Sequence, residues 1–173
     1  MDLLVVRHSD AGDAKEFART GQPDDLRPLS DKGRKQMQRA ASALRRIVPQ
    51  CDRVFSSPLK RAVETAEILC SAFGLPAPET TRTLIPGGDL RDFEQWAAGV
   101  GKSQCVAVVG HEPHLSTLVT WLMTATNESR IVMKKGGACL VEFAGPARAG
   151  EGELRWLLGP RELDLMAEAK ESS

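Results

Sequence analysis

Two short apolar runs restrict the fold of this chain more than any other feature. Leu3–Val6 opens the sequence, and Cys105–Val109 repeats the same pattern far along it. Uninterrupted apolar residues over so few positions are typical of strands that are buried on both faces. Segment 30–48, which lies between them, places apolar residues at three- and four-residue steps and therefore predicts an amphipathic helix. Strand-like and helix-like segments thus alternate along the chain.

Local signals set the expected boundaries of these elements. Ser30 is a suitable N-cap for the first long helix, and Pro49 ends that helix. After a second strand at 53–56, Ser57-Pro58 is interpreted as the N-cap and first-turn proline of the next helix. The other expected elements are a long loop with one helical turn at 9–29, a helix end at Gly74, a proline-rich stretch at 76–88, helices at 89–98 and 115–123, strands at 138–143 and 153–158, and fraying residues at 168–173.

The alternation of strands and helices predicts an α/β fold. We expect a three-layer sandwich with a mostly parallel central sheet and helices on both faces, in a single domain that spans residues 1–173. Crossovers between parallel strands should be right-handed. In such folds, ligands bind outside the carboxyl ends of the strands, so that edge of the sheet is where functional residues are sought.

Composition narrows the class of function. The chain has 173 residues, of which 42% are apolar, and its 23 basic side chains balance 23 acidic ones. This balance argues against a dedicated nucleic-acid binder, which usually carries a basic excess. No apolar run approaches the roughly 18–20 residues that span a bilayer, so no membrane association is expected. We therefore expect a cytoplasmic protein, monomeric, with four reduced and mostly buried cysteines.

Three of the expected strands end in unusual chemistry. The first ends in Arg7-His8, the second in Ser56-Ser57 with Arg61 one helical turn further on, and the third in Gly110-His111. The carboxyl ends of parallel neighbouring strands meet at one edge of a sheet, so these groups should converge. A histidine beside arginine should have a lowered pKa, and a neutral imidazole is a nucleophile or a base. The planar guanidinium fork suits phosphate oxygens.

Each residue also has an ordinary structural reading. Arg61 lies in the first helical turn, where a cation is disfavoured and a bound anion is favoured. It could instead pair with Glu64, just as Arg7 could pair with Asp10. A lone histidine is usually just hydrogen-bonded within the wall of a crevice. Two histidines and several arginines at corresponding strand ends are harder to explain in this way. They indicate phosphoryl transfer through a phosphohistidine.

These segments resemble a known family. Leu4–Ala11 is similar to the R-H-G/S-x-A signature of the histidine phosphatase superfamily, which has the phosphoglycerate-mutase-like fold. Ser56–Ala66 resembles its S-S-P-x-x-R-A-x-x-T-A segment, and Val109–His111 resembles its late G-H motif. Finer features resemble the SixA-type branch, the phosphohistidine phosphatases: Arg27–Gly33, Gly110–Pro113, Lys134–Gly136, and Trp156 before Pro160.

The resemblance implies roles for individual residues. His8 would attack phosphorus and become phosphorylated, and water would then hydrolyse that intermediate. Arg7, Arg61 and His111 would hold the phosphoryl oxygens and neutralise the charge of the transition state. Arg27 and Ser57 would add contacts to the phosphate. No metal and no cofactor are expected, because arginines supply the positive charge.

One departure from the family pattern bears on the substrate. Larger members carry a glutamate that protonates the leaving oxygen, whereas the matching region here is Leu84–Asp89, without a glutamate. An alkoxide needs an acid, but imidazole can leave as a neutral molecule. The sequence therefore favours phosphohistidine in a partner protein over phosphate esters. Asp10, Asp89 or Glu112 could substitute for the missing acid.

Other interpretations stay open. A second enzyme hypothesis is hydrolysis of small phosphate esters or anhydrides, and a hypothesis of another class is a phospho-binding module with little activity. A metal site could use His8, His111, His114 and Asp10, although the neighbouring arginines would repel a cation. Lys134-Lys135 is interpreted as a solvated turn, or else as a feature that guides an acidic partner.

Overall fold

The fold is built on a six-stranded sheet with the strand order β3-β2-β4-β1-β5-β6. We describe it from a computed structural model, for residues 1–100 and 103–169. β1, β2, β3 and β4 run parallel to one another, and β5 and β6 extend the sheet in antiparallel pairings. The bounds of the strands are Asp2–Arg7 for β1, Arg53–Ser56 for β2, Glu79–Thr80 for β3, Cys105–Gly110 for β4, Ala138–Glu142 for β5 and Glu153–Leu158 for β6.

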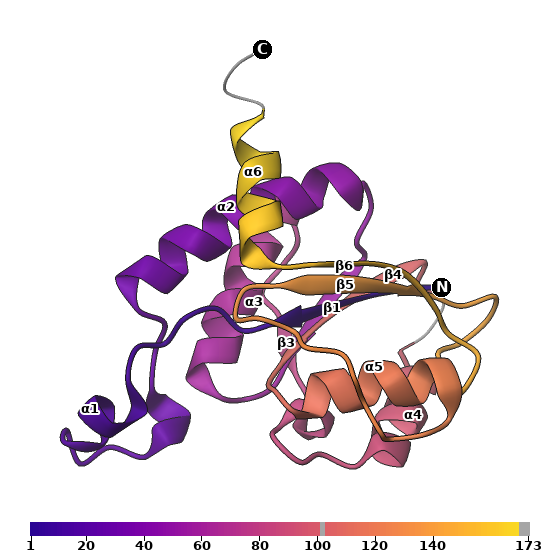
Figure 1. Ribbon diagram of the computed structural model, residues 1–173, viewed down its shortest axis with the longest axis horizontal. Coiled ribbons are helices and arrows are strands. Elements are labelled where there is room, and N and C mark those ends of the chain that lie inside the picture. The colour runs from indigo at the N-terminus through magenta and orange to yellow at the C-terminus, as the bar shows by residue number, and fades with distance from the viewer. Residues whose placement is uncertain (101–102, 170–173) are drawn as a thin grey trace.

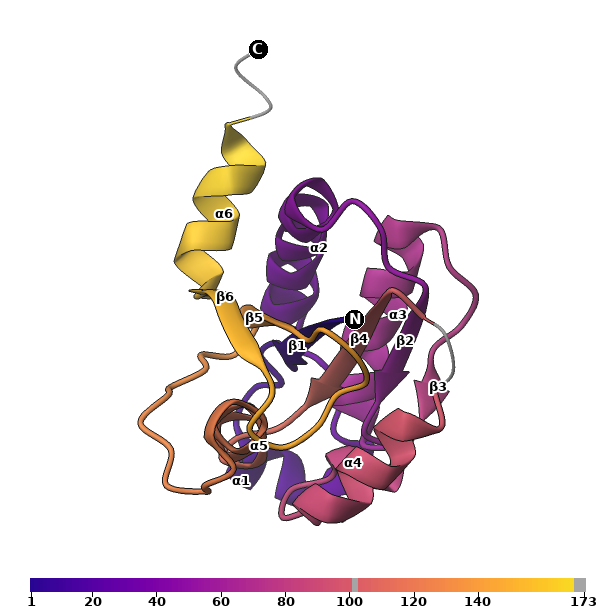
Figure 2. The ribbon, with the colours of Figure 1, turned by 90° about the vertical axis from the view of Figure 1, so that its right-hand side faces the viewer.

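Helices cover both faces of this sheet (Figure 1). Helices α2, α3 and α6 lie on one face and α4 and α5 on the other, as the view turned by 90° shows (Figure 2). This arrangement confirms the predicted three-layer α/β sandwich with a mostly parallel central sheet. The bounds are Ala14–Ala18 for α1, Asp31–Ile47 for α2, Lys60–Phe73 for α3, Leu90–Ala98 for α4, His114–Thr124 for α5 and Pro160–Glu168 for α6, with 3-10 turns η1 at Asp24–Leu26 and η2 at Arg82–Leu84.

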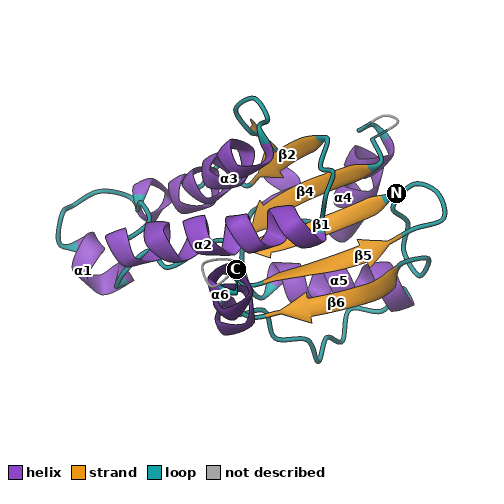
Figure 3. Cartoon of the chain, turned by 90° about the horizontal axis from the view of Figure 1, so that it is seen from above, coloured by secondary structure: helices purple, strands orange, loops and turns teal. Residues whose placement is uncertain are grey.

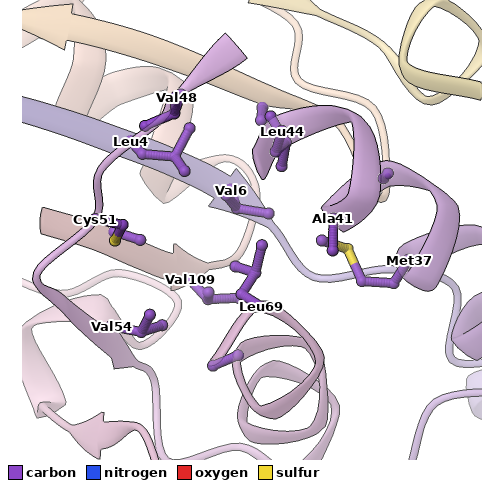
Figure 4. Packing of buried hydrophobic residues seen from close by; sticks show 14 of the residues in the cluster. Leu4, Val6, Met37, Ala41, Leu44, Val48, Cys51, Val54, Leu69 and Val109 are labelled. Atoms are coloured by element: carbon purple, nitrogen blue, oxygen red, sulfur yellow. The ribbon is translucent and has the colours of Figure 1, made fainter. Parts of the chain in front are cut away.

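The strand β1 explains why helices must pack on both faces of the sheet. Its four central residues are all buried, and they alternate between two hydrophobic clusters. Leu4 and Val6 pack in the cluster beneath α2, α3 and α6, of which Figure 4 shows the centre. Leu3 and Val5 pack against α4 and α5. A strand with apolar side chains on both sides is stable only between two helical layers, since each fully buried side chain contributes about 1.5–3 kcal/mol.

Most of the predicted helix boundaries are found. The Ser30 hydroxyl accepts a hydrogen bond from the Gly33 amide at 3.0 Å, which caps α2, and that helix ends two residues before Pro49. Gly74 closes α3 in the left-handed conformation.

Within residues 1–100 and 103–169, no helix has the length and apolar character needed to cross a membrane. The four cysteines are free and buried, as predicted.

Three details of the sequence interpretation are wrong: the start of α3, the omission of α6, and the omission of β3 within the proline-rich stretch 76–88. Ser57-Pro58 does not cap α3, which begins at Lys60 after Leu59. Ser57 instead continues the β2 ladder, because its amide donates to the Val109 carbonyl oxygen at 2.9 Å. The Ser57 hydroxyl lies within hydrogen-bonding distance of His111. The second error is the omission of α6, a helix that begins at Pro160. The expected fraying of 168–173 falls largely outside the described residues, which end at 169.

Candidate active site

The sheet register brings the three predicted strand ends together. Arg7 pairs with Gly110 across β1 and β4, and Ser56 pairs with Val109 across β2 and β4. One residue further on, the His8 amide donates to the Gly110 carbonyl oxygen at 3.1 Å. Seen from above, β1, β2 and β4 all point toward the end of the molecule where α1 lies (Figure 3). The candidate site therefore lies at the carboxyl edge of the parallel strands.

Two imidazoles form the centre of this site. The rings of His8 and His111 are both buried, with their centroids 4.9 Å apart. His8 Nδ1 lies 2.7 Å from the Ser9 carbonyl oxygen. Because a carbonyl oxygen can only accept, Nδ1 carries the proton and Nε2 holds the lone pair. His111 Nε2 lies 2.9 Å from the Ser57 hydroxyl, which is the partner that replaces the expected helix cap.

The surroundings keep both imidazoles neutral. Burial is the largest influence on His8, and with the nearby charges of Arg61, Arg7 and Lys135 it lowers the pKa to about 4, against a smaller opposing effect of the Ser9 carbonyl. Burial also lowers the pKa of His111 to about 3, with further contributions from His8 and Arg61. At neutral pH the His8 Nε2 lone pair is therefore available for nucleophilic attack.

The charges of Arg61, which is buried, and of the half-buried Arg7 act on His8, and the pairings considered as structural alternatives are not formed. Arg61 Nη1 bonds to Asp24, at 3.0 Å to its carbonyl oxygen and 3.1 Å to its carboxylate, rather than to Glu64. Arg7 Nη1 donates to the Met133 carbonyl oxygen at 2.7 Å, rather than to Asp10. The Nε atoms of both arginines are buried and have no partner among the described residues. Unpartnered buried donors fit an anionic ligand, since such groups otherwise cost free energy.

Arg27 lies beside Arg61, but the chain itself uses most of its donors. Its Nε donates to the Asp24 carboxylate at 2.7 Å, and Nη1 donates to the carbonyl oxygens of Ala11 and Gly12 at 3.1 and 3.2 Å. Asp24 thus joins the two guanidinium groups. In this structure Arg27 fastens the loop after His8, so its predicted contact with phosphate stays a prediction.

The three candidate acids differ in their surroundings. Hydrogen bonds from Lys135 and Ser30 are the largest influences on Asp10 and lower its pKa to about 2, so it holds no proton at neutral pH. Asp89 is an exposed N-cap of α4, where its carboxylate accepts from the Arg91 amide at 2.7 Å. Glu112 directly follows His111 and accepts from the Ser116 hydroxyl at 2.6 Å. Of the three, Glu112 is the one whose charge acts on Arg7.

His114, named in the metal alternative, bonds to the main chain. His114 is the first residue of α5, and its Nε2 lies 2.9 Å from the carbonyl oxygen of Thr83 in η2. Within the described part of the chain, no three His, Cys, Asp or Glu side chains are grouped so that they could hold a metal ion. The structure also reveals two residues that the sequence analysis did not place in the site: Asp24, which bonds both Arg61 and Arg27, and Lys135, which bonds Asp10.

The lowered pKa values predict that acid destabilises the fold. Histidine in an unfolded chain titrates near 6.5, whereas His8 and His111 titrate at about 4 and about 3 in the folded protein. Between these limits the unfolded chain binds more protons, so the free energy of unfolding should fall as the pH drops from 6.5 toward 3. The shift of His8 alone corresponds to about 3 kcal/mol. Urea unfolding at a series of pH values measures this slope.

The matched control is the double variant His8→Gln, His111→Gln, in which neither side chain titrates. Its free energy of unfolding should depend less steeply on pH over the same range. An unchanged slope would show that these imidazoles are not held neutral by the fold.

Comparison with known proteins identifies the family of this chain. The family model of the Histidine phosphatase superfamily (branch 1) matches residues 3–85, which include Arg7, His8 and Arg61. The chain belongs to the histidine phosphatase superfamily. Membership of this superfamily supports phosphatase activity.

Within the superfamily the chain is SixA-like. The phosphohistidine phosphatase SixA of Escherichia coli is 24% identical over 168 residues, with 95% of this chain and 98% of that protein covered. A solved structure of the protein histidine phosphatase SixA with tungstate superimposes with a TM-score of 0.79 at 26% identity, covering 94% of this chain and 99% of that one. An uncharacterised protein of Picosynechococcus sp. is 31% identical over 141 residues, covering 79% and 82% of the two chains.

Proposed function

We propose that this phosphatase removes the phosphoryl group from phosphohistidine in a partner protein and that His8 is its nucleophile. The observation that carries the proposal is the state of His8: a buried ring beside His111, with a lowered pKa and a hydrogen bond from Nδ1 to the Ser9 carbonyl oxygen, which leaves the lone pair on Nε2. A neutral imidazole attacks phosphorus directly, and no separate base is needed to prepare it.

The reaction proceeds in two displacements. His8 Nε2 attacks phosphorus in line, the bond to the leaving group breaks, and its electron pair departs with that group. The guanidinium groups of Arg7 and Arg61 neutralise charge on the phosphoryl oxygens as it develops. Water then attacks phosphorus, and His8 leaves as the electron pair returns to Nε2. The hydrogen bond from Nδ1 to the Ser9 carbonyl oxygen stabilises the positive charge on the ring between the two steps.

The choice of substrate rests on the missing glutamate of segment 84–89 and on the charge state of Asp10. Segment 84–89 contains no glutamate, and Asp10 is ionised at neutral pH. A phosphohistidine that is protonated on its other nitrogen releases neutral imidazole and needs no acid, whereas an alkyl phosphate releases an alkoxide that does. The similarity to the phosphohistidine phosphatase SixA supports the same choice. Small phosphate esters or anhydrides are the second substrate class.

The proposal also covers the protein's general properties. We propose that the chain acts as a monomer of one domain over 1–173, in the cytoplasm, without metal or cofactor, because arginines and histidines provide the charge. Its partner is a phosphorylated protein. If the chain is instead a phospho-binding module, it will bind that partner without turnover.

The test offers one enzyme preparation two kinds of substrate in the presence of EDTA. A histidine-phosphorylated carrier protein should be dephosphorylated with a higher kcat/KM than any member of a panel of alkyl and aryl phosphates. Faster turnover of every ester would contradict the substrate assignment and leave the phosphatase intact. Loss of all activity in EDTA, restored by a divalent metal, would contradict the metal-free mechanism.

A further inference from the structure

The turn Lys134–Gly137, just before β5, is fastened to the nucleophile. The Gly136 amide donates to the carbonyl oxygens of both Arg7 and His8 at 3.2 Å, and the Arg7 amide donates to the Gly137 carbonyl oxygen at 3.0 Å. Gly136 has a φ of 74°, which favours glycine, and a Cβ there would lie 3.3 Å from the Ser9 hydroxyl. The backbone around Lys135 is therefore fixed relative to His8.

The side chain of Lys135 is directed to the same site. Its Nζ lies 3.0 Å from Oδ1 of Asp10, two residues after His8. Asp10 is itself held, because its other carboxylate oxygen accepts from the Ser30 hydroxyl at 2.8 Å and from the Gly12 amide at 3.2 Å. The Lys135 side chain is 41% exposed, whereas that of Arg61 is 7% exposed. Lys135 thus places a positive charge at the outer edge of the site.

We infer that Lys135 is a further substrate-contacting residue, whose ammonium group binds an oxygen of the phosphoryl group that Arg7 and Arg61 hold from within. This inference rests on the proposed function and deepens it. An ammonium group has three N–H donors, and Asp10 is the one side chain bonded to Nζ among the described residues. Two donors therefore remain for a ligand, and lysine binds phosphate as a compact point charge.

The electrostatics of His8 agree with this position. Lys135 is one of the three cations, with Arg61 and Arg7, that lower the pKa of His8, so its charge acts at the ring where phosphorus would bind. As a partly exposed ion pair with Asp10, Lys135 should contribute little to the stability of the fold. Its effects on catalysis and on folding can therefore be separated.

The test compares Lys135→Gln with the matched control Lys134→Gln and the charge-conserving Lys135→Arg. The probe is inorganic phosphate, measured as a competitive inhibitor of aryl phosphate hydrolysis and by calorimetry. Loss of one charge-assisted hydrogen bond should raise the inhibition constant of phosphate by about 10–100-fold in Lys135→Gln. Lys134→Gln, on the exposed neighbour, should stay within about twofold, and Lys135→Arg should keep most of the affinity.

A second readout is the acid limb of the pH profile of kcat/KM. Lys135→Gln removes one of the charges that disfavour protonation of His8, so this limb should move to higher pH. Equal phosphate affinity in Lys135→Gln and Lys134→Gln, at unchanged thermal stability, would overturn the inference. Calorimetric phosphate binding remains measurable if the wild type fails to dephosphorylate phosphohistidine, so failure of the proposed function is distinguishable from failure of this contact.

Discussion

Replacing His8 with alanine should lower turnover by at least about 10⁴-fold, because it removes the proposed acceptor of the phosphoryl group in the covalent intermediate. The ring of His8 is buried beside His111 with Nε2 free, and a methyl group cannot accept a phosphoryl group. Steady-state hydrolysis of an aryl phosphate measures the loss. Rapid alkaline quenching of the wild type, followed by mass spectrometry, should detect one phosphoryl group on the peptide that contains residue 8.

The thermal unfolding midpoint of His8→Ala serves as the control for folding. His8 belongs to neither hydrophobic core cluster, so His8→Ala should keep a cooperative unfolding transition. A folded His8→Ala variant with near wild-type turnover, or a phosphoryl group trapped on a different peptide, would contradict the nucleophile assignment while leaving the fold and the superfamily untouched.

The second large effect is expected at Arg61. Replacing it with alanine should lower kcat/KM by about 10²–10³-fold, since it removes a buried donor that stabilises developing charge on the phosphoryl oxygens. The Arg61 side chain is 7% exposed, and its Nε has no partner among the described residues. Arg61→Lys should recover part of the activity, because it restores the charge but not the planar fork. Initial rates over a range of substrate concentrations measure both variants.

Arg39 provides the matched control for Arg61. It lies on α2, about half exposed, and pairs with Asp164 and Glu168 of α6. Arg39→Ala also replaces an arginine with alanine, but this arginine belongs to surface ion pairs. Its kcat/KM should therefore stay within about twofold of the wild type. A loss in Arg61→Ala no larger than that in Arg39→Ala would exclude Arg61 from the reaction.

Much of the fold could be predicted because its strongest signals are local. The apolar runs of β1 and β4 are too short for helices and too apolar for an exposed sheet, so they required helices on both faces. Placing Arg7, His8 and His111 together needed one further rule, that parallel strands end at the same edge. The register of β1 against β4 satisfies that rule.

The rest depended on contacts between distant segments. Ser57 has the local properties of a helix cap, but a hydrogen bond to Val109 draws it into the sheet. The short helix α6 has one fully buried residue, Leu163, and is stabilised by packing on α2, which periodicity does not reveal. Lys135 resembles any lysine in a polar turn, and Asp10, its partner, lies 125 positions away.

The bonds between the turn at Gly136 and the backbone of Arg7 and His8 have a consequence for biosynthesis. The imidazole of His8 is synthesised long before the backbone that orients it has all its partners, because the backbone of Arg7 and His8 pairs with Gly110 and with the turn just before β5. A nascent chain that ends before residue 137 lacks these partners, and we expect it to show no phosphatase activity. We therefore expect phosphatase activity to arise only after the turn at Gly136 has been synthesised and has paired with β1.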